Sequence, residues 1–396
     1  MNVINKLFVF LFSITLLTNL SSCKDDEVEP KPQIIQALEL NCETVPEDST
    51  LTLVDLGLEV DYVLNCIGKV RGDLIIEPGV TVQFGTDAGI KVSETGSIQV
   101  LGTAQDPVVF TGEDLIPGSW KGIFIDSKDV KNKIEYATVE YAGGGYFNSN
   151  GDLGGVIVYS NTLLNMNNTT ISHSKAYGFN ASYGGDELVL KDNTITNCNV
   201  PMLVLPNYVD GMDGGTYTGN KTDAIYVANG FTTIDATWRN LGVPYHILAR
   251  LVVSAGGGKL TINPGVVMEF GLNGSLEVAE GASGSKPSLI AVGTAQNPIL
   301  FTGIDKVEGA WKGIWFDTPS ALNEIGFVTI EYASNSDQSG AIYMWYGTIL
   351  NVHDVLFKDI KECAIHQYVS SAGDSSNLTT SNLSFENVGS TTICQN

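Results

Sequence analysis

The stretch Gly102-Thr-Ala-Gln-Asp-Pro-Val-Val-Phe-Thr-Gly112 returns nearly unchanged as Gly293-Thr-Ala-Gln-Asn-Pro-Ile-Leu-Phe-Thr-Gly303. Two more pairs of blocks share this offset of 191 positions: Trp120-Lys-Gly-Ile123 with Trp311-Lys-Gly-Ile314, and Val139-Glu-Tyr-Ala142 with Ile330-Glu-Tyr-Ala333. Three blocks that recur in the same order at one offset indicate an internal duplication of the chain.

Blocks on either side of these match at an offset of 186. They are Leu74-Ile-Ile-Glu-Pro-Gly-Val80 with Leu260-Thr-Ile-Asn-Pro-Gly-Val266, and Gly154-Gly-Val-Ile-Val-Tyr159 with Gly340-Ala-Ile-Tyr-Met-Trp345. The offset rises because the second half has an insertion within Gly281–Leu289, and it falls again because the first half has a longer loop, Gly143–Asp152. Insertions confined to loops between matched segments are typical of stacked repeat units.

The segments between the loops read as short β-strands. Each has four to seven residues of roughly alternating apolar and polar character and ends at Gly, Asn or Asp, as in LIIEPG (74–79) and VTVQFG (80–85). Asparagines near strand ends are expected to adopt left-handed backbone angles; they are Asn165, Asn167, Asn168, Asn193 and Asn197.

Short strands in nearly uniform steps favour an all-β, right-handed parallel β-helix, a solenoid built from two duplicated halves. The alternative is an array of β-sandwiches, which would need the longer crossovers of Greek-key connections. The motifs PGV-x-(V/M)-x-F, GTAQ(D/N)P-(V/I)-x-FTG, W-K-G-I and (V/I)-E-Y-A resemble those of right-handed β-helix repeat lipoproteins of Bacteroidetes, with a pectate-lyase-like fold, over about residues 60–390. The resemblance implies the fold and no definite activity, since most such proteins have no assigned reaction.

The first residues have the features of a bacterial lipoprotein signal. Lys6 precedes the apolar run Leu7–Leu17, which is too short to span a bilayer, and Leu20-Ser-Ser-Cys23 matches a lipobox. We therefore expect residues 1–22 to be removed and Cys23 to carry several acyl chains, palmitate among them, because one chain binds a membrane only marginally. An ordinary secretory peptide with an incidental cysteine is the alternative.

Residues 23–36 are expected to form an acidic, flexible tether, followed by a first half (37–244) and a second half (245–396). The segment Lys24–Pro32 resembles the acidic tag behind the lipidated cysteine of surface-exposed Bacteroidetes lipoproteins. The resemblance implies an outer-membrane lipoprotein that faces the cell exterior; a spacer that faces the periplasm is the alternative.

The net charge of −23 argues against nucleic acid as a partner, because phosphate binding requires clustered Lys and Arg, and the chain has three arginines. Five cysteines remain beside Cys23. Sequence proximity pairs Cys42 with Cys66 and Cys363 with Cys394, and leaves Cys198 as a small buried apolar residue.

No recognisable catalytic motif is present. The paired-aspartate elements of polygalacturonases and the strand motif of pectin methylesterases are absent, and no arginine lies in a recognisable lyase motif. Lys121 and Lys312 recur in both halves, which favours a structural role. The four histidines show no metal-ligand spacing.

Two glycine-rich loops could bind Ca²⁺, a cation that prefers six to eight oxygen ligands. One offers Asn148, Asn150 and Asp152, without the bidentate Glu of an EF-hand, and the other offers Asp210 and Asp213. Polar turns of this kind are common in any β-helix, so a purely structural role is the alternative.

Aromatic residues are the clearer sign of binding. Tyr343 and Trp345 are two positions apart and should share a strand face, with Tyr346 on the other, and Trp315 is expected on the preceding coil. Flat aromatic side chains are suited to stacking against sugar rings. The duplicated Trp120 and Trp311 are instead expected to cover the core.

These features predict a membrane-anchored, non-catalytic β-helix that binds a glycan or another surface macromolecule. A calcium-dependent polysaccharide lyase is the enzymatic alternative, and a structural spacer is the third.

Overall fold

The computed structural model describes residues 36–148, 151–160, 162–254, 258–279, 284–335, 340–370, 375–389 and 392–395. Residues from Gln36 onward belong to one compact unit. The predicted signal peptide, Cys23, nearly all of the tether and the candidate calcium ligand Asn150 therefore lie outside the described residues. Among the described residues, no helix has the length and apolar character needed to cross a membrane.

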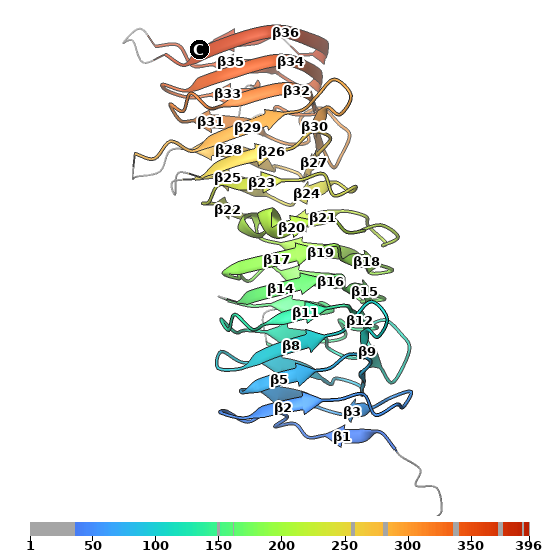
Figure 1. The fold of residues 1–396 in the computed structure, drawn as a ribbon. Coiled ribbons are helices and arrows are strands. Elements are labelled where there is room, and N and C mark those ends of the chain that lie inside the picture. The colour runs from blue at the N-terminus through green and yellow to red at the C-terminus, as the bar shows by residue number, and fades with distance from the viewer. Residues whose placement is uncertain are drawn as a thin grey trace, which may run out of the picture. The chain divides into compact units, whose positions relative to one another are not determined.

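The described chain is a stack of β-coils in which every strand pair is parallel, from the blue coils at one end to the red coils at the other (Figure 1). Four sheets run along the stack, and the sole helix described is the short 3₁₀ element η1 (Pro206–Gly211). The prediction of a right-handed parallel β-helix is confirmed.

Sheets A and C belong to the first half. The strands of sheet A are β1 (Leu38–Leu40), β3 (Tyr62–Leu64), β6 (Thr81–Phe84), β9 (Val108–Gly112), β12 (Ala137–Glu140), β15 (Thr170–Ser172) and β18 (Thr194–Thr196). Those of sheet C are β2 (Thr50–Leu53), β5 (Asp73–Ile76), β8 (Ser97–Leu101), β11 (Lys133–Glu135), β14 (Leu163–Asn167), β17 (Glu187–Lys191) and β20 (Met212–Asp213).

Sheet B runs through both halves, and sheet D begins with β22, near the end of the predicted first half, and runs through the second. The first-half strands of sheet B are β4 (Ile67–Val70), β7 (Gly89–Val92), β10 (Ile123–Ile125), β13 (Val156–Val158), β16 (Tyr177–Ala181) and β19 (Val200–Val204). It continues through β21 (Ile225–Val227), β24 (Tyr245–Ile247), β27 (Val267–Phe270), β30 (Ile299–Gly303), β32 (Glu324–Glu331), β34 (Ile349–Ile360) and β36 (Asn377–Val388). A second arm of sheet B, joined at β32, contains β29 (Ser288–Val292), β26 (Lys259–Ile262) and β23 (Ala236–Trp238). Sheet D contains β22 (Gly230–Thr232), β25 (Arg250–Val253), β28 (Ser275–Ala279), β31 (Gly313–Asp317), β33 (Gly340–Met344), β35 (Cys363–Gln367) and β37 (Ile393–Gln395).

Single left-handed residues turn the chain at the corner between sheets C and A. Tyr136, Asn168 and Asp192 have φ angles of 47°, 50° and 54° there. Among the asparagines predicted to turn left-handed, Asn168 and Asn197 do so, whereas Asn165, Asn167 and Asn193 do not. Asn193 is buried, and its side chain accepts a hydrogen bond from the Thr169 amide (3.0 Å) and donates one to the Met166 carbonyl (2.8 Å). It therefore ties two coils together, which satisfies its polar atoms inside the stack.

The core is the row of inward-pointing side chains along each sheet. Trp120 and Trp311 are fully buried, stack on Phe84 and Phe270 at ring distances of 4.0 and 4.1 Å, and donate their indole N–H to the carbonyls of Glu140 and Glu331. The prediction that these duplicated tryptophans cover the core is confirmed.

The two halves are not simply translated copies. Strand for strand, β21 and β24 are the counterparts of β1 and β3, with Ile225 paired to Tyr245 as Leu38 is paired to Tyr62. However, β21 pairs with β19 of sheet B and not with a strand of sheet A. The strands therefore join different sheets in the two halves: counterparts of sheet A strands continue sheet B, and counterparts of sheet B strands form sheet D.

Candidate functional site

An aromatic ladder occupies the outer side of sheet D. Parallel pairing places Trp315 of β31 opposite Tyr343 of β33, and Tyr343 opposite His366 of β35. The preceding residues of these three strands (Ile314, Ile342 and Ile365) are fully buried. Because side chains alternate between the two sides of a strand, the three rings project outward in a row.

Ring contacts extend this ladder into a continuous surface. Tyr343 lies 4.8 Å from His366, 6.0 Å from Trp345 and 6.2 Å from Trp315, measured between ring centroids. Tyr368 in turn lies 5.0 Å from Trp345 and 6.2 Å from Tyr346. We call these six residues the sheet D aromatic surface; they are Trp315, Tyr343, Trp345, Tyr346, His366 and Tyr368. Trp345 is 39% exposed and Tyr346 is 50% exposed, so the outer part is open to solvent.

The structure brings together the three binding residues expected from the sequence, Trp315, Tyr343 and Trp345. The expectation that Tyr346 lies on the other face is wrong, because β33 ends at Met344 and the chain then turns, so that alternation stops. Sequence reasoning missed His366 and Tyr368. Each lies 23 positions after an aromatic partner, Tyr343 and Trp345 respectively, so the length of one coil was the signal that could have found them.

The sheet D aromatic surface is mainly apolar, with a few polar groups beside its rings. Burial raises the pKa of the Tyr343 phenol, which therefore stays a neutral hydrogen-bond donor at physiological pH. The Trp315 indole N–H is buried and makes no hydrogen bond within the described residues. Below Trp315 on the same ladder, Glu277 accepts hydrogen bonds from Arg250 (2.6 Å) and Ser275 (2.8 Å), which neutralises its charge.

The arginines are held in local contacts. The closest contacts of the guanidinium groups are Arg71 to Glu43 (2.7 Å), Arg239 to the Asp210 carbonyl (2.7 Å) and Arg250 to Glu277 (2.5 Å). A lyase uses a cation to bind the carboxylate of its substrate, and each arginine here already has an anionic or carbonyl partner.

A close acid–base pair lies on sheet B. His246 is 2.5 Å from one carboxylate oxygen of Glu269, and Lys306 is 3.0 Å from the other. The hydrogen bond with His246, helped by Lys306, holds the pKa of Glu269 below its usual value. A carboxylate that is stabilised in its charged form is a weak general base.

The residues predicted to bind calcium form hydrogen bonds within the chain or lie exposed. Asn148 donates its backbone and side-chain N–H groups to the two carboxylate oxygens of buried Asp152, at 3.3 and 3.1 Å, which closes the loop. Asp210 accepts from the Thr237 amide (2.6 Å), and Asp213 is exposed on β20. Among the described residues, no three side chains from His, Cys, Asp and Glu form a group that could hold a metal ion. A calcium site at these loops stays a prediction.

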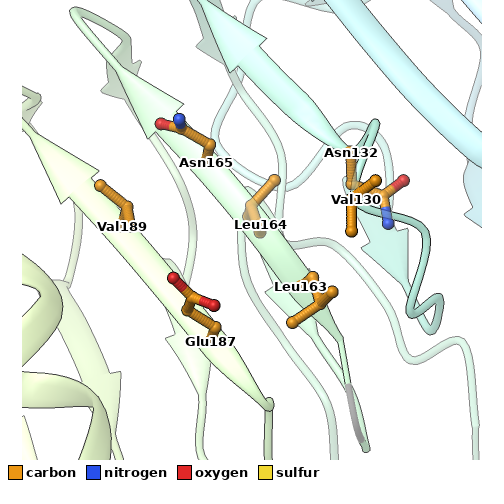
Figure 2. Close-up of a pocket in the computed structure, with 7 residues that line it drawn as sticks. All are labelled: Val130, Asn132, Leu163, Leu164, Asn165, Glu187 and Val189. Carbon is orange, nitrogen blue, oxygen red and sulfur yellow. The ribbon is translucent and has the colours of Figure 1, made fainter.

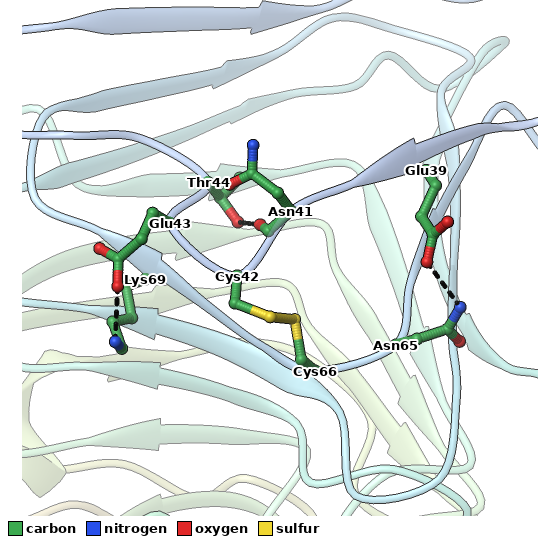
Figure 3. The surroundings of a disulfide bond; sticks show 8 residues. All are labelled: Glu39, Asn41, Cys42, Glu43, Thr44, Asn65, Cys66 and Lys69. Carbon is green, nitrogen blue, oxygen red and sulfur yellow. Dashed lines mark hydrogen bonds and ion pairs between the residues drawn. A yellow bond between two sulfur atoms is a disulfide. The ribbon is translucent and has the colours of Figure 1, made fainter.

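The structure joins both cysteine pairs that sequence proximity predicted. Cys42–Cys66 links the first coil to the second, flanked by hydrogen bonds from Asn65 to Glu39 and from Lys69 to Glu43 (Figure 3). Cys363–Cys394 joins β35 to β37. Cys198 is a free, buried cysteine, and burial raises the pKa of its thiol to about 11, so it is a poor nucleophile.

A pocket of about 220 Å³ on sheet C has no aromatic lining. It lies over neighbouring strands β14 and β17 and is lined by Val130, Asn132, Leu163, Leu164, Asn165, Glu187 and Val189 (Figure 2). The pocket is small, and Glu187 is its single charged residue. It therefore offers fewer groups for binding a ligand than the sheet D aromatic surface does.

Comparison with known proteins supports the same fold. A family model described as a pectate-lyase-like β-helix domain matches residues 52–159, within the first half. No curated protein matches the chain. A domain of this type is compatible with a carbohydrate-related function.

Proposed function

We propose that this protein is an envelope-anchored lipoprotein whose β-helix binds neutral glycans without cleaving them. The observation that carries the proposal is the sheet D aromatic surface, where six rings from three coils are in mutual contact and two of them are largely open to solvent. Sugar rings present apolar faces that stack on such platforms, and hydroxyl groups at their edges can accept from Trp and Tyr donors.

Charge favours a neutral ligand. The chain carries a net charge of −23, so it would repel a polyuronate at long range. Its arginines already contact carboxylate or carbonyl groups of the chain and do not form a cluster that could bind the uronate carboxylates. The same observations count against the alternative of a calcium-dependent polysaccharide lyase.

Binding is tested on the full chain purified in detergent, against immobilised neutral glycans (β-1,4-glucan, β-1,3-glucan, mannan, xylan) and two polyuronates. Replacing Tyr343 and Trp345 by Ala should weaken binding of the neutral glycan at least tenfold, since each lost ring contact contributes about 1 kcal/mol. Tyr136→Asn removes an exposed ring on another face and keeps a residue that tolerates its left-handed backbone, so it should bind as the unmodified chain does.

Two outcomes would contradict the proposal. Formation of unsaturated products from a polyuronate, lost on chelation of calcium, would establish the lyase instead. Binding that is unchanged in the Tyr343→Ala/Trp345→Ala variant would exclude this surface as the site.

Anchoring at the outer membrane, facing the exterior, rests on the sequence of residues 1–36. Cys23→Ala should abolish incorporation of labelled palmitate and move the protein out of the membrane fraction, because the acyl chains supply the membrane affinity. Digestion of intact cells by an added protease tests display: loss of the protein supports outward exposure, and full protection would place it inside the envelope.

A further inference from the structure

We infer that the first half contains a second binding site for a neutral glycan, on sheet B, in the pocket between Tyr146 and Tyr177. The inference rests on the proposed function, because it assigns the same ligand class to a second surface. It predicts that one chain binds two glycan segments on two different faces of the β-helix.

The duplication places aromatic residues at matching positions in both halves. Phe124 of β10 is the counterpart of Trp315, and Tyr159, just after β13, is the counterpart of Trp345. Their rings are again in contact, with centroids of Phe124 and Tyr159 5.5 Å apart, and Tyr159 stacks on Tyr183 at 5.6 Å. The first half therefore builds an aromatic row on its own version of the strands that carry the sheet D aromatic surface.

The longer loop of the first half covers part of this aromatic row. Phe147 packs on Phe124 at 5.3 Å, so that Phe124 is fully buried while its counterpart Trp315 is only partly buried. The loop is fastened by Lys121, which donates to the Tyr146 carbonyl at 3.0 Å, and by the Asn148–Asp152 hydrogen bonds. Because Phe124 is covered, a ligand cannot reach its ring. The loop itself carries Tyr146, whose side chain is 52% exposed.

Beside the loop lies a pocket of about 500 Å³, within the range of small-molecule binding sites. Tyr146 and Tyr177 line it, together with Leu153, Lys175 and Asn199. The rings of Tyr146 and Tyr177 can stack against sugar rings. The Lys175 ammonium and the Asn199 amide can form hydrogen bonds with hydroxyl groups. Next to the pocket, the Tyr177 ring lies 6.5 Å from Tyr226, and the Tyr226 ring stacks on His246 at 5.3 Å; these rings would support further sugar rings of a chain.

The two sites belong to different sheets. Tyr177 of the pocket lies on β16 of sheet B, and sheet B continues through the second half as a separate sheet from sheet D. One glycan segment lying along one sheet therefore cannot occupy both sites. Two sites on one body would bind a polymeric glycan more tightly than either site alone, through effective concentration.

The test is the stoichiometry of binding to the full chain in detergent, by calorimetry with cellohexaose, laminarihexaose and mannohexaose. For the hexasaccharide that binds, we expect two sites per chain. Tyr146→Ala/Tyr177→Ala and Tyr343→Ala/Trp345→Ala should each leave one site, and the fourfold variant none. Tyr146→Phe/Tyr177→Phe should keep both, because it keeps the rings, and Tyr136→Asn is the matched control.

The outcomes separate this inference from the proposed function. One site per chain that is lost with Tyr343 and Trp345, and unaffected at Tyr146 and Tyr177, would overturn the second site and leave the proposed function standing. Loss of all binding with Tyr146 and Tyr177 alone would support the sheet B site and exclude the sheet D one. No binding of any hexasaccharide would overturn both. Tyr146→Ala alone, in an exposed loop position, serves if the double variant fails to fold, and should weaken one of two sites at least fivefold.

Discussion

Equivalent residues have taken different roles in the two halves. His353 stands where the first half has Asn167, and it lies between two carboxylates, with Asp354 at 2.9 Å and Glu324 at 3.1 Å. The hydrogen bond to Asp354, with a further one to Glu324, raises the pKa of His353 above its usual value. Gly326 lies beneath the ring, and a Cβ there would be 2.3 Å from it. The first half has Glu135 at that position, so the histidine and the glycine changed together.

We predict that His353→Asn lowers the free energy of unfolding by about 1 kcal/mol at pH 5.5, the usual net contribution of an intramolecular hydrogen bond. Because the folded pKa is raised, the stabilisation is fully present below the unfolded pKa near 6.5 and disappears as the pH rises through the folded value. The variant and the unmodified chain should therefore unfold alike at pH 9 in urea titrations. A difference that is the same at both pH values would contradict this account.

At the scale of elements, single left-handed residues bend the chain at the corners of the coils. The counterparts of Tyr136 and Asn168 are Phe327 and Asp354, with φ angles of 51° and 53°, and they lie inside the long strands β32 and β34. A single left-handed residue thus bends the chain sharply while the ladder continues on both sides. These positions cost free energy for most residues, because the Cβ approaches the following carbonyl.

We predict that Asn168→Ala costs about 1 kcal/mol of stability, whereas Asn168→Gly changes it by less than about half of that. Asn168 is exposed, so the backbone angle and not packing dominates the effect. Asn165→Ala, at an exposed position with an ordinary φ on the preceding strand β14, is the control and should be neutral. Chemical denaturation measures all three, and equal effects of Ala and Gly at position 168 would contradict the argument.

At the scale of the molecule, each coil contacts its neighbours and the core is a row of local layers. Stability in such a solenoid is approximately a sum over units and their interfaces, so damage to one layer should stay near it. Trp120 and Trp311 occupy equivalent layers in the two halves, with the same stacking and the same hydrogen bond.

We therefore predict that Trp120→Phe, which removes one hydrogen bond and part of a buried ring system, costs about 2 kcal/mol locally. Hydrogen exchange should accelerate in β6, β9 and β12 by tenfold or more and stay unchanged in β30, β32 and sheet D. Trp311→Phe should give the mirror result. Uniform acceleration along the whole chain would show that the stack unfolds as one unit instead.

Much of this architecture was predictable from local patterns. The duplicated blocks, the alternation of apolar and polar residues and the turn residues predicted the parallel β-helix, and the two-residue spacing of Tyr343 and Trp345 correctly placed them on one side. The partners His366 and Tyr368 were missed because they lie one coil away, and Tyr346 was misplaced because the end of β33 interrupts the alternation.

The duplicated blocks beginning at Gly102 and Gly293 were enough to establish the fold, since alternation along a strand dictates which side chains point into the core. They did not reveal that equivalent strands join different sheets in the two halves. That change depends on β21 pairing directly with β19, and alternation carries no information about which sheet a strand joins. Only the tertiary structure decided that the two aromatic surfaces, built from equivalent strands, lie on different sheets.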